Sequence, residues 1–91
     1  MEIEFDPFKR TMTLAERGLD MARAGEIFDA NHLTVQDGRK DYGEDRFISI
    51  GFLDGRMVLI AWTLRGEAIR IISMRKANER EQEKYGERLG K

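Results

Sequence analysis

The sequence predicts an α+β fold, in which a small antiparallel β-sheet carries two N-terminal helices and a C-terminal helix. Three features predict it. Two segments before residue 31 have apolar residues at helical spacing, residues 46–75 form three strand-like runs joined by tight turns, and a strongly polar segment follows. A chain of 91 residues is expected to form one domain, residues 1–91, with a single modest core.

The N-terminal half is predicted to hold one short strand and two helices. Residues 1–5 alternate between apolar and acidic side chains, as a half-buried strand does. A helix then begins with Asp6 as its N-cap and Pro7 in its first turn, and it ends at Gly18, which suits a left-handed C-terminal cap. A second helix is expected over residues 20–30. The apolar residues at helical spacing are Phe8, Met12 and Ala15 in the first helix and Met21, Ala24, Ile27 and Phe28 in the second.

The C-terminal half is predicted to be mostly strand. The expected elements are a brief strand at 32–36, a polar loop at 37–45, strands at 46–53, 56–65 and 68–75, and a polar helix at 77–91 whose end frays. Asp54–Gly55 is the strongest short hairpin signal, and Gly66 marks the second turn. These turns predict a meander of three consecutive antiparallel strands.

Two-residue turns also fix which side chains share a sheet face. They place Leu53 opposite Arg56 and Arg65 opposite Ala68. One face, which the N-terminal helices should cover, then carries Phe47, Val58, Ile60, Trp62, Leu64, Ile69 and Ile71. The other face carries Ile48, Ile50, Phe52, Met57, Leu59, Ile72 and Met74 at one end.

At its opposite end this second face carries Thr63 and three arginines, Arg46, Arg65 and Arg70, which we call the arginine corner. Two interpretations are open. The arginine stems could simply cover the edge of an apolar face while their charged ends stay in water. Alternatively, the guanidinium groups could bind phosphate, because their planar forks match its geometry and keep their charge.

The overall composition excludes several classes of protein. Sixteen basic residues against seventeen acidic ones argue against a protein that coats nucleic acid through its overall field, although a local basic patch is compatible with that balance. The absence of cysteine excludes a disulfide framework and a thiol nucleophile. No apolar run reaches 18 residues and no basic-then-apolar leader opens the chain, so we expect a cytoplasmic protein without a membrane partner.

Few residue types remain that could carry metal or nucleophilic chemistry. His32 is the single histidine, so a two-histidine ribonuclease mechanism within one chain is excluded, and His32 should cap or fill a helix-to-strand connection. Ser73 has no histidine to activate it. Tyr42 and Tyr85 offer aromatic surface for stacking on bases. The acidic residues between the helices and the main strands lack calcium-loop spacing, so neither a metal nor another cofactor is expected; they are Asp37, Asp41, Glu44 and Asp45.

Several stretches together resemble one protein family. In order they are EFDPFKR, a helix ending in Gly18, AGEIFD, DYGEDRFISIG and DGRMVLIAWTLRGEAIRIISMRKANEREQEKY. Over residues 2–85 this order resembles the BrnT toxins, the ribonuclease half of a bacterial type II toxin–antitoxin pair. The most specific stretch, IRIISMRKANEREQEKY at 69–85, is similar to a family ending of the form IRIISARKA…ER…Y, and EDRFISIG is similar to a family E-x-RF-x-x-IG motif.

The resemblance implies a RelE-like fold that cleaves RNA on a sheet face and thereby inhibits translation and growth. It also implies a ribbon-helix-helix antitoxin, BrnA-like, which neutralises the toxin and represses the operon, so that operator DNA is contacted only through the antitoxin. Carried over by motif, the matching residues are Glu44 and Arg46 in the E-x-R, Arg65 at the end of the central strand, and Arg70, Arg75 and Lys76 as the last-strand basic residues.

On this basis the sequence predicts a metal-independent endoribonuclease. Glu44 is the candidate general base, and Arg65 and Arg70 are candidates to stabilise the extra negative charge of the transition state. Tyr85 or Lys76 would help to protonate the leaving group. Candidate RNA-binding residues are Arg46, Arg75, Lys76 and Arg17.

One position departs from the family pattern. Where the family usually has Lys-His-Gly at the end of the first helix, this sequence has Glu16-Arg17-Gly18. Gly18 keeps the turn, so the fold is unaffected. The alternative function is therefore a catalytically weak or inactive module that acts mainly as an antitoxin-binding partner.

Overall fold

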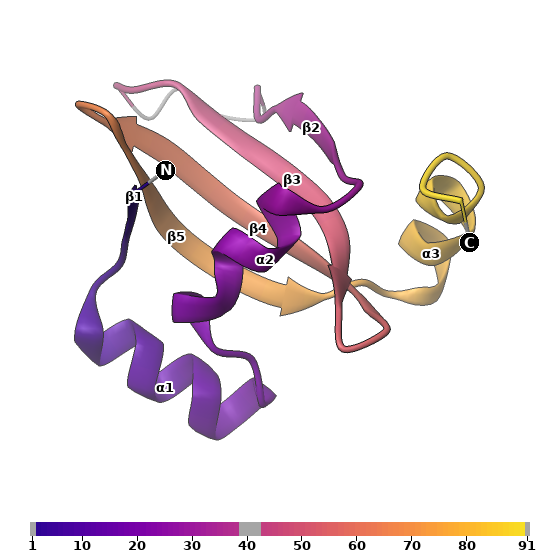
Figure 1. Ribbon diagram of the computed structural model, residues 1–91, viewed down its shortest axis with the longest axis horizontal. Coiled ribbons are helices and arrows are strands. Elements are labelled where there is room, and N and C mark those ends of the chain that lie inside the picture. Colours follow the sequence, from indigo (N-terminus) through magenta and orange to yellow (C-terminus); the bar gives the residue numbers. More distant parts are fainter. Residues whose placement is uncertain (1, 39–42, 91) are drawn as a thin grey trace.

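The computed structural model describes residues 2–38 and 43–90, and it confirms the α+β class. Five strands form one sheet in the order β1-β5-β4-β3-β2 (Figure 1). The elements are β1 (Glu2–Glu4), α1 (Pro7–Arg17), the 3-10 helix η1 (Met21–Arg23), α2 (Ala24–Asp29), β2 (Leu33–Gln36), β3 (Arg46–Leu53), β4 (Arg56–Arg65), β5 (Ala68–Lys76) and α3 (Glu79–Gly86). The sheet is mixed rather than wholly antiparallel, because β1 pairs with β5 in parallel. Predictions on Asp41 and Tyr42 lie outside the described residues.

The predicted register of the three long strands is confirmed. Leu53 pairs with Arg56 and Arg65 pairs with Ala68, so both turns have two residues. Asp54 has a φ of 53° and Gly55 a φ of 78°, the left-handed pair that a tight hairpin turn requires. The local turn chemistry therefore fixes how the strands meet.

A β-bulge in β5 makes one predicted face wrong. Trp62 pairs with Ile71 but its neighbour Ala61 pairs with Ser73, which leaves Ile72 as an extra residue. Beyond the bulge each side chain of β5 turns to the opposite face. Met74, predicted on the second face, is instead buried on the helix-covered face.

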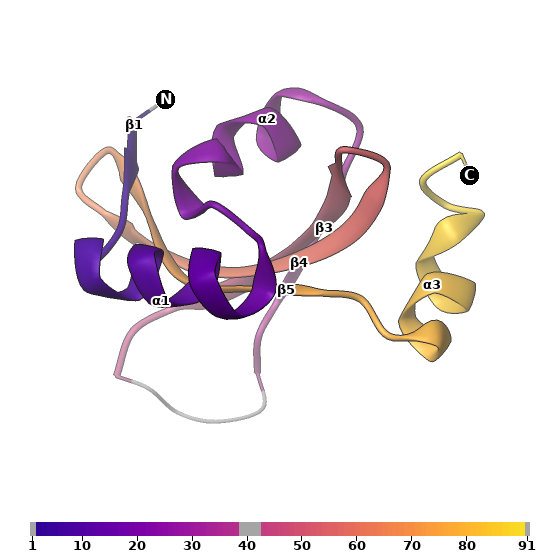
Figure 2. The ribbon, with the colours of Figure 1, turned by 90° about the horizontal axis from the view of Figure 1, so that it is seen from below.

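The sheet has an apolar cluster on each face. On one face, Leu19 and side chains of η1 and α2 pack against the strands (Figure 2); the cluster is Leu19, Met21, Ala24, Ile27, Leu53, Val58, Ile60, Ile69, Ile71 and Met74. On the other face, Tyr85 of α3 and Leu89 after it pack against the strands; the buried cluster there is Ile50, Met57, Leu59, Ala77 and Leu89. Leu64 was predicted in the core but is exposed, because it lies at the end of β4 next to the β4–β5 turn and outside both clusters.

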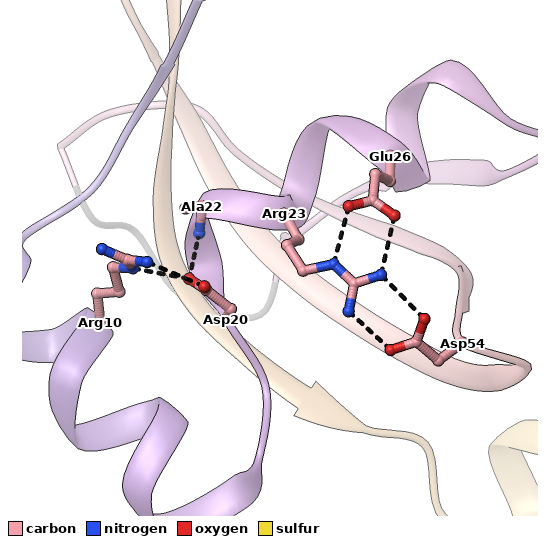
Figure 3. A network of polar contacts seen from close by, with 6 residues as sticks. All are labelled: Arg10, Asp20, Ala22, Arg23, Glu26 and Asp54. Carbon is pink, nitrogen blue, oxygen red and sulfur yellow. Dashed lines mark hydrogen bonds and ion pairs between the residues drawn. The ribbon is translucent and has the colours of Figure 1, made fainter.

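Helix α1 packs with its polar side inward. Asp6 caps it and Gly18 ends it in the left-handed conformation, as predicted. Its apolar stripe nevertheless faces solvent, and Phe8 is 63% exposed. On the opposite side of the helix, Arg10 donates two hydrogen bonds to Asp20, at 2.7 and 3.0 Å (Figure 3). This bidentate pair, rather than apolar burial, ties α1 to the segment that follows it.

A second arginine joins the N-terminal helices to the sheet. Arg23 of η1 forms bidentate pairs with Glu26 of α2 and with Asp54 in the β3–β4 turn, all at 2.7–2.9 Å (Figure 3). The pairs are solvent-exposed, so each contributes little to stability. Their geometry still aligns η1 and α2 over the hairpin.

Polar contacts fix the start of α3 and the segment that follows this helix. The Asn78 side chain and Glu81 form a reciprocal capping box at the start of α3. α3 ends at Gly86, earlier than predicted, and the fraying of its end stays a prediction. Leu89 is buried, and its carbonyl oxygen accepts a 3.2 Å hydrogen bond from the Asn31 amide. His32 lies in the α2–β2 connection as predicted, with Nδ1 2.8 Å from the Ala30 carbonyl oxygen.

Gly51 permits α2 to approach β3 closely, and this predicts a stability effect. A Cβ atom at Gly51 would lie 2.6 Å from Cγ2 of the buried Ile27, whereas one at Gly38 would meet nothing within 4 Å. Gly51→Ala should therefore lower the free energy of unfolding by about 1–3 kcal/mol through overpacking. Urea denaturation of Gly51→Ala and the control Gly38→Ala checks this. Equal midpoints would contradict the close approach.

Candidate functional site

The sheet face opposite α2 brings the predicted arginine corner together. Arg46 pairs with Thr63 and Thr63 pairs with Arg70, so these three residues lie side by side across β3, β4 and β5. Arg65 follows Thr63 by two residues and so lies on the same face. Adjacent strands are about 4.8 Å apart, so the guanidinium groups of two arginines on neighbouring strands can reach one phosphate group. The corner lies at the end of the sheet that holds the β4–β5 turn (Figure 1).

Carboxylates of the chain lie next to two corner arginines. Glu4 is opposite Arg70 in the parallel β1–β5 pair, with Oε1 3.5 Å from Nη1 of Arg70. Glu44 has Oε1 4.0 Å from Nη2 of Arg46. Both separations are longer than the roughly 2.7–2.9 Å of a charge-assisted hydrogen bond. The two ion pairs are therefore weaker than a bidentate pair such as that of Arg10 with Asp20.

Thr63 positions the acidic end of this site. Its side chain is buried, and Oγ1 donates a 2.6 Å hydrogen bond to the carbonyl oxygen of Asp45. This bond holds the segment immediately before β3, and therefore Glu44, against the arginines. The sequence analysis placed Thr63 in the corner but gave it no role. The sequence pattern that could have indicated this role is the register itself, which places the Thr63 hydroxyl between Arg46 and Arg70.

A shallow depression of about 70 Å³ continues along the same face toward α3. It is lined by Ile48, Leu59, Ala61, Ser73 and Arg75. The bulge at Ile72 puts Ser73 and Arg75 on this face. Arg75 therefore lies on the face of the arginine corner, and the depression forms a path from the corner toward the other end of the sheet.

Arg75 is fixed by Glu81 of α3. Nη1 and Nη2 of Arg75 donate to the two carboxylate oxygens of Glu81 at 2.8 and 2.7 Å. The same carboxylate accepts a hydrogen bond from the backbone of Asn78. The hydrogen bonds from Arg75 are the main reason that the pKa of Glu81 falls to about 2. This pair joins the end of β5 to the last helix.

The Arg75–Glu81 pair should make stability depend on pH below the ordinary carboxylate range. The folded-state pKa of Glu81, about 2, is below its ordinary value of 4.5, so the pair stabilises the fold above pH 4.5 and this contribution is lost as pH falls toward 2. Urea melts of wild type and Glu81→Gln should differ most near neutral pH and converge between pH 4.5 and 2. A stability difference that stays constant over this range would contradict the assignment.

Three predicted site residues lie away from the corner. Tyr85 packs on α3 against the second apolar cluster, at the other end of the face. Lys76 lines a separate cavity between the β3–β4 turn and α3. Arg17 donates a 2.8 Å hydrogen bond from Nη1 to the Met74 carbonyl oxygen, in the part of β5 beyond its pairing with β1. The structure thus brings Glu44 to the arginine corner, whereas Tyr85, Lys76 and Arg17 lie away from the corner.

Within residues 2–38 and 43–90, no three histidine or acidic side chains cluster in a way that could hold a metal ion. None of the helices in this part of the chain is long and apolar enough to cross a membrane. Two of the acidic residues considered for a metal site adjoin strands: Asp37 directly follows β2, and Asp45 directly precedes β3. The Asp37 backbone N–H donates a hydrogen bond to the Arg46 carbonyl oxygen.

The fold and this face together define a small α+β domain with an arginine-lined candidate site for an anionic substrate. The family model that describes a ribonuclease toxin, BrnT, of type II toxin–antitoxin systems matches residues 5–81. The chain belongs to this family. A search of curated proteins gave no match to the sequence. Membership identifies a ribonuclease toxin that functions with an antitoxin, while the similarity to RelE stays a prediction.

Proposed function

We propose that residues 1–91 form one toxin domain, an endoribonuclease whose active site is the arginine corner with Glu44. The observation that carries the proposal is the register of Arg46, Thr63 and Arg70 across three strands, with Arg65 on the same face. Family membership supplies the substrate class, RNA. Guanidinium groups suit this role because they stay charged and bind phosphate oxygens in pairs.

The chemistry proposed is attack by a ribose 2′-hydroxyl on the adjacent phosphorus. Glu44 accepts the proton of the hydroxyl, the bond to the 5′-oxygen breaks as that oxygen takes a proton from water, and the products are a 2′,3′-cyclic phosphate and a 5′-hydroxyl. Arg65 and Arg70 stabilise the additional negative charge on phosphorus oxygens as it develops, an effect often worth about 3–4 kcal/mol per donor. The geometry does not support Tyr85 as a proton donor to the same phosphate as Glu44, because Tyr85 lies at the far end of the face.

The partner proposed is a ribbon-helix-helix antitoxin of the BrnA type. Family membership indicates an antitoxin, and the proposal adds its fold and its role as the operator-binding half of the pair. Free toxin would then cleave RNA in the cytoplasm, where translation takes place, and inhibit growth. Co-expression with the neighbouring antitoxin gene should restore growth and yield a purified complex.

The alternative, a weak or inactive antitoxin-binding module, has one structural observation in its favour. Arg17, at the position where the family pattern has histidine, is engaged with the Met74 carbonyl of β5 rather than directed to the arginine corner. Its replacement of histidine thus fits a structural role. The presence of all three corner arginines favours the enzyme over the module.

Metal independence gives a direct test of the proposed chemistry. Purified protein should cleave RNA at an unchanged rate in EDTA and leave 2′,3′-cyclic phosphate ends, because Glu44 and arginines replace metal-bound water and metal charge. End-group analysis of the fragments checks the products. Cleavage that stops with EDTA and returns with magnesium would overturn the mechanism, and the absence of cleavage in both conditions would favour the alternative.

A further inference from the structure

A cavity of about 340 Å³ lies between the β3–β4 turn and α3, outside the arginine corner. Phe52 and Met57 form a cross-strand pair at the end of β3 and β4, and α3 forms the other wall. The complete lining is Phe52, Gly55, Arg56, Met57, Lys76, Ala77, Gln82 and Gly86. Its volume falls at the lower end of the range typical of small-ligand sites, about 300–1,000 Å³.

The cavity lies on the same sheet face as the arginine corner. Phe52 follows Arg46 by six residues in β3, and Met57 precedes Thr63 by six in β4, so strand alternation points all four side chains to one face. Six residues of strand span about 20 Å. Arg75, which pairs with Leu59, lies between the two places. A chain bound at the corner can therefore continue past Arg75 to the cavity.

The lining combines two kinds of group that suit the base of a nucleotide. Phe52 and Met57 give an aromatic and an apolar surface, and the Gln82 amide is oriented by its 3.2 Å hydrogen bond to the Ala77 carbonyl oxygen. None of the lining residues is acidic. Arg56 pairs with Leu53 and Lys76 pairs with Val58, so strand alternation directs the side chains of these two lining residues toward the helix-covered face. Unpaired RNA bases are bound by stacking on aromatic rings and by polar groups at their edges, while cations bind the backbone.

Gly86 leaves room for such a ligand on the helix side. A Cβ atom at this position would meet nothing within 4 Å, although Gly86 belongs to α3. Glycine is a poor helix former, so leucine here should favour the helix while projecting into the cavity. Gly86→Leu can therefore block the cavity without removing any side chain that supports the fold.

We propose that this cavity is an RNA subsite that takes one unpaired nucleotide several positions from the cleaved phosphate and so contributes to the choice of cleavage site. The proposal rests on the proposed ribonuclease function. It assigns Phe52 and Gln82 to this subsite, and it gives Arg75 a place on the path between the subsite and the arginine corner.

The binding test uses probes that the protein cannot cleave. The four nucleoside 5′-monophosphates, ribose 5-phosphate and a 2′-O-methyl RNA oligonucleotide are titrated into the full chain and followed by amide NMR. Nucleotides and the oligonucleotide should shift the amides of Phe52, Gly55 and Gln82, and ribose 5-phosphate should shift them much less. Gly86→Leu and, independently, Phe52→Leu should weaken this binding at least about tenfold, as expected when a base loses its space or its stacking partner. Arg80→Ala, which removes an exposed cation of α3 outside the cavity lining, should bind like wild type.

Cleavage kinetics separate this proposal from the proposed function. If wild type cleaves RNA, Gly86→Leu should raise KM and change the pattern of cleavage sites while its thermal melt stays native. Wild-type KM, site pattern and nucleotide shifts in both Gly86→Leu and Phe52→Leu would overturn the subsite and leave the ribonuclease assignment intact. Equal shifts with ribose 5-phosphate and nucleotides would overturn the nucleotide assignment in favour of a simple phosphate site. Nucleotide shifts at the cavity without any cleavage by wild type would support a nucleotide site there and overturn its role in choosing a cleavage site, together with the proposed function.

Discussion

Arg70→Ala is expected to lower the rate of RNA cleavage about a hundredfold or more while the protein remains folded. Arg70 is only partly buried, and its ion pair with Glu4 is long, so its loss should change the free energy of unfolding by no more than about 0.5 kcal/mol. The large effect on rate arises because the guanidinium would stabilise charge that appears only in the transition state. Cleavage rates and thermal melts of the same preparations separate the two effects.

Arg70→Lys provides a matched control for charge alone. A single ammonium group cannot bind two phosphate oxygens through a planar fork, so lysine should restore only a small part of the rate. The same variants should lose toxicity in growing cells. Full recovery by lysine would mean that Arg70 supplies a general positive field rather than a directed contact, and wild-type cleavage by Arg70→Ala would remove it from the site.

Trp62→Ala is expected to lower the free energy of unfolding by about 3–5 kcal/mol, enough to unfold most molecules of so small a domain. Trp62 packs against the first apolar cluster, stacks on Phe47 with ring centres 4.7 Å apart and contacts Phe28 edge-on. Its indole Nε1 donates a 2.8 Å hydrogen bond to Oγ of Ser49, which is buried. The substitution removes the aromatic packing and one of the two hydrogen-bond partners of a buried hydroxyl, which keeps its contact with Thr34 Oγ1.

Trp62→Phe keeps an aromatic ring and removes the indole N–H, so it should be clearly less destabilising than Trp62→Ala. Chemical denaturation followed by circular dichroism measures both. A folded, soluble Trp62→Ala protein that has lost only RNA binding would show that Trp62 belongs to the RNA-binding face and that the two sheet faces are assigned the wrong way round.

Features set by local chemistry could be predicted from the sequence. The N-cap at Asp6, the left-handed Gly18 and the Asp54–Gly55 turn each depend on a few neighbouring residues. Once both turns have two residues, alternation alone places Arg46, Thr63 and Arg70 in register. The arginine corner was therefore predictable because it follows from turn length.

Features set by contacts between distant residues could not be predicted. The bulge at Ile72 has no turn residue to mark it, yet it moves Met74 into the core and Arg75 onto the face of the arginine corner. The inward polar side of α1 depends on Arg10 reaching Asp20, which opposes the usual burial of an apolar stripe. The parallel pairing of β1 with β5 joins residues 2–4 to residues 68–70, which are far apart in the sequence.

The candidate site divides in the same way. Arg46, Arg65 and Arg70 lie at the positions that the predicted register gave them, and their role stays a prediction. Tyr85 and Lys76, assigned through motif similarity, follow the bulge in the chain. Tyr85 lies at the other end of this face, and strand alternation turns Lys76 toward the helix-covered face. Ser73 reaches the shallow depression only because the bulge turns it there. The larger cavity needs α3 to fold back beside the β3–β4 turn, and no local pattern indicates that arrangement.

The central claim, that the arginine corner is the active site, is tested most directly by one set of cleavage rates. Wild type, Arg46→Ala, Arg65→Ala, Arg70→Ala and the control Arg80→Ala are compared on one RNA under single-turnover conditions, with a thermal melt of each. The three corner variants should remain folded and cleave far more slowly than wild type, and Arg80→Ala should cleave at the wild-type rate. Wild-type rates in all three corner variants would contradict the claim and place the active site elsewhere on the protein.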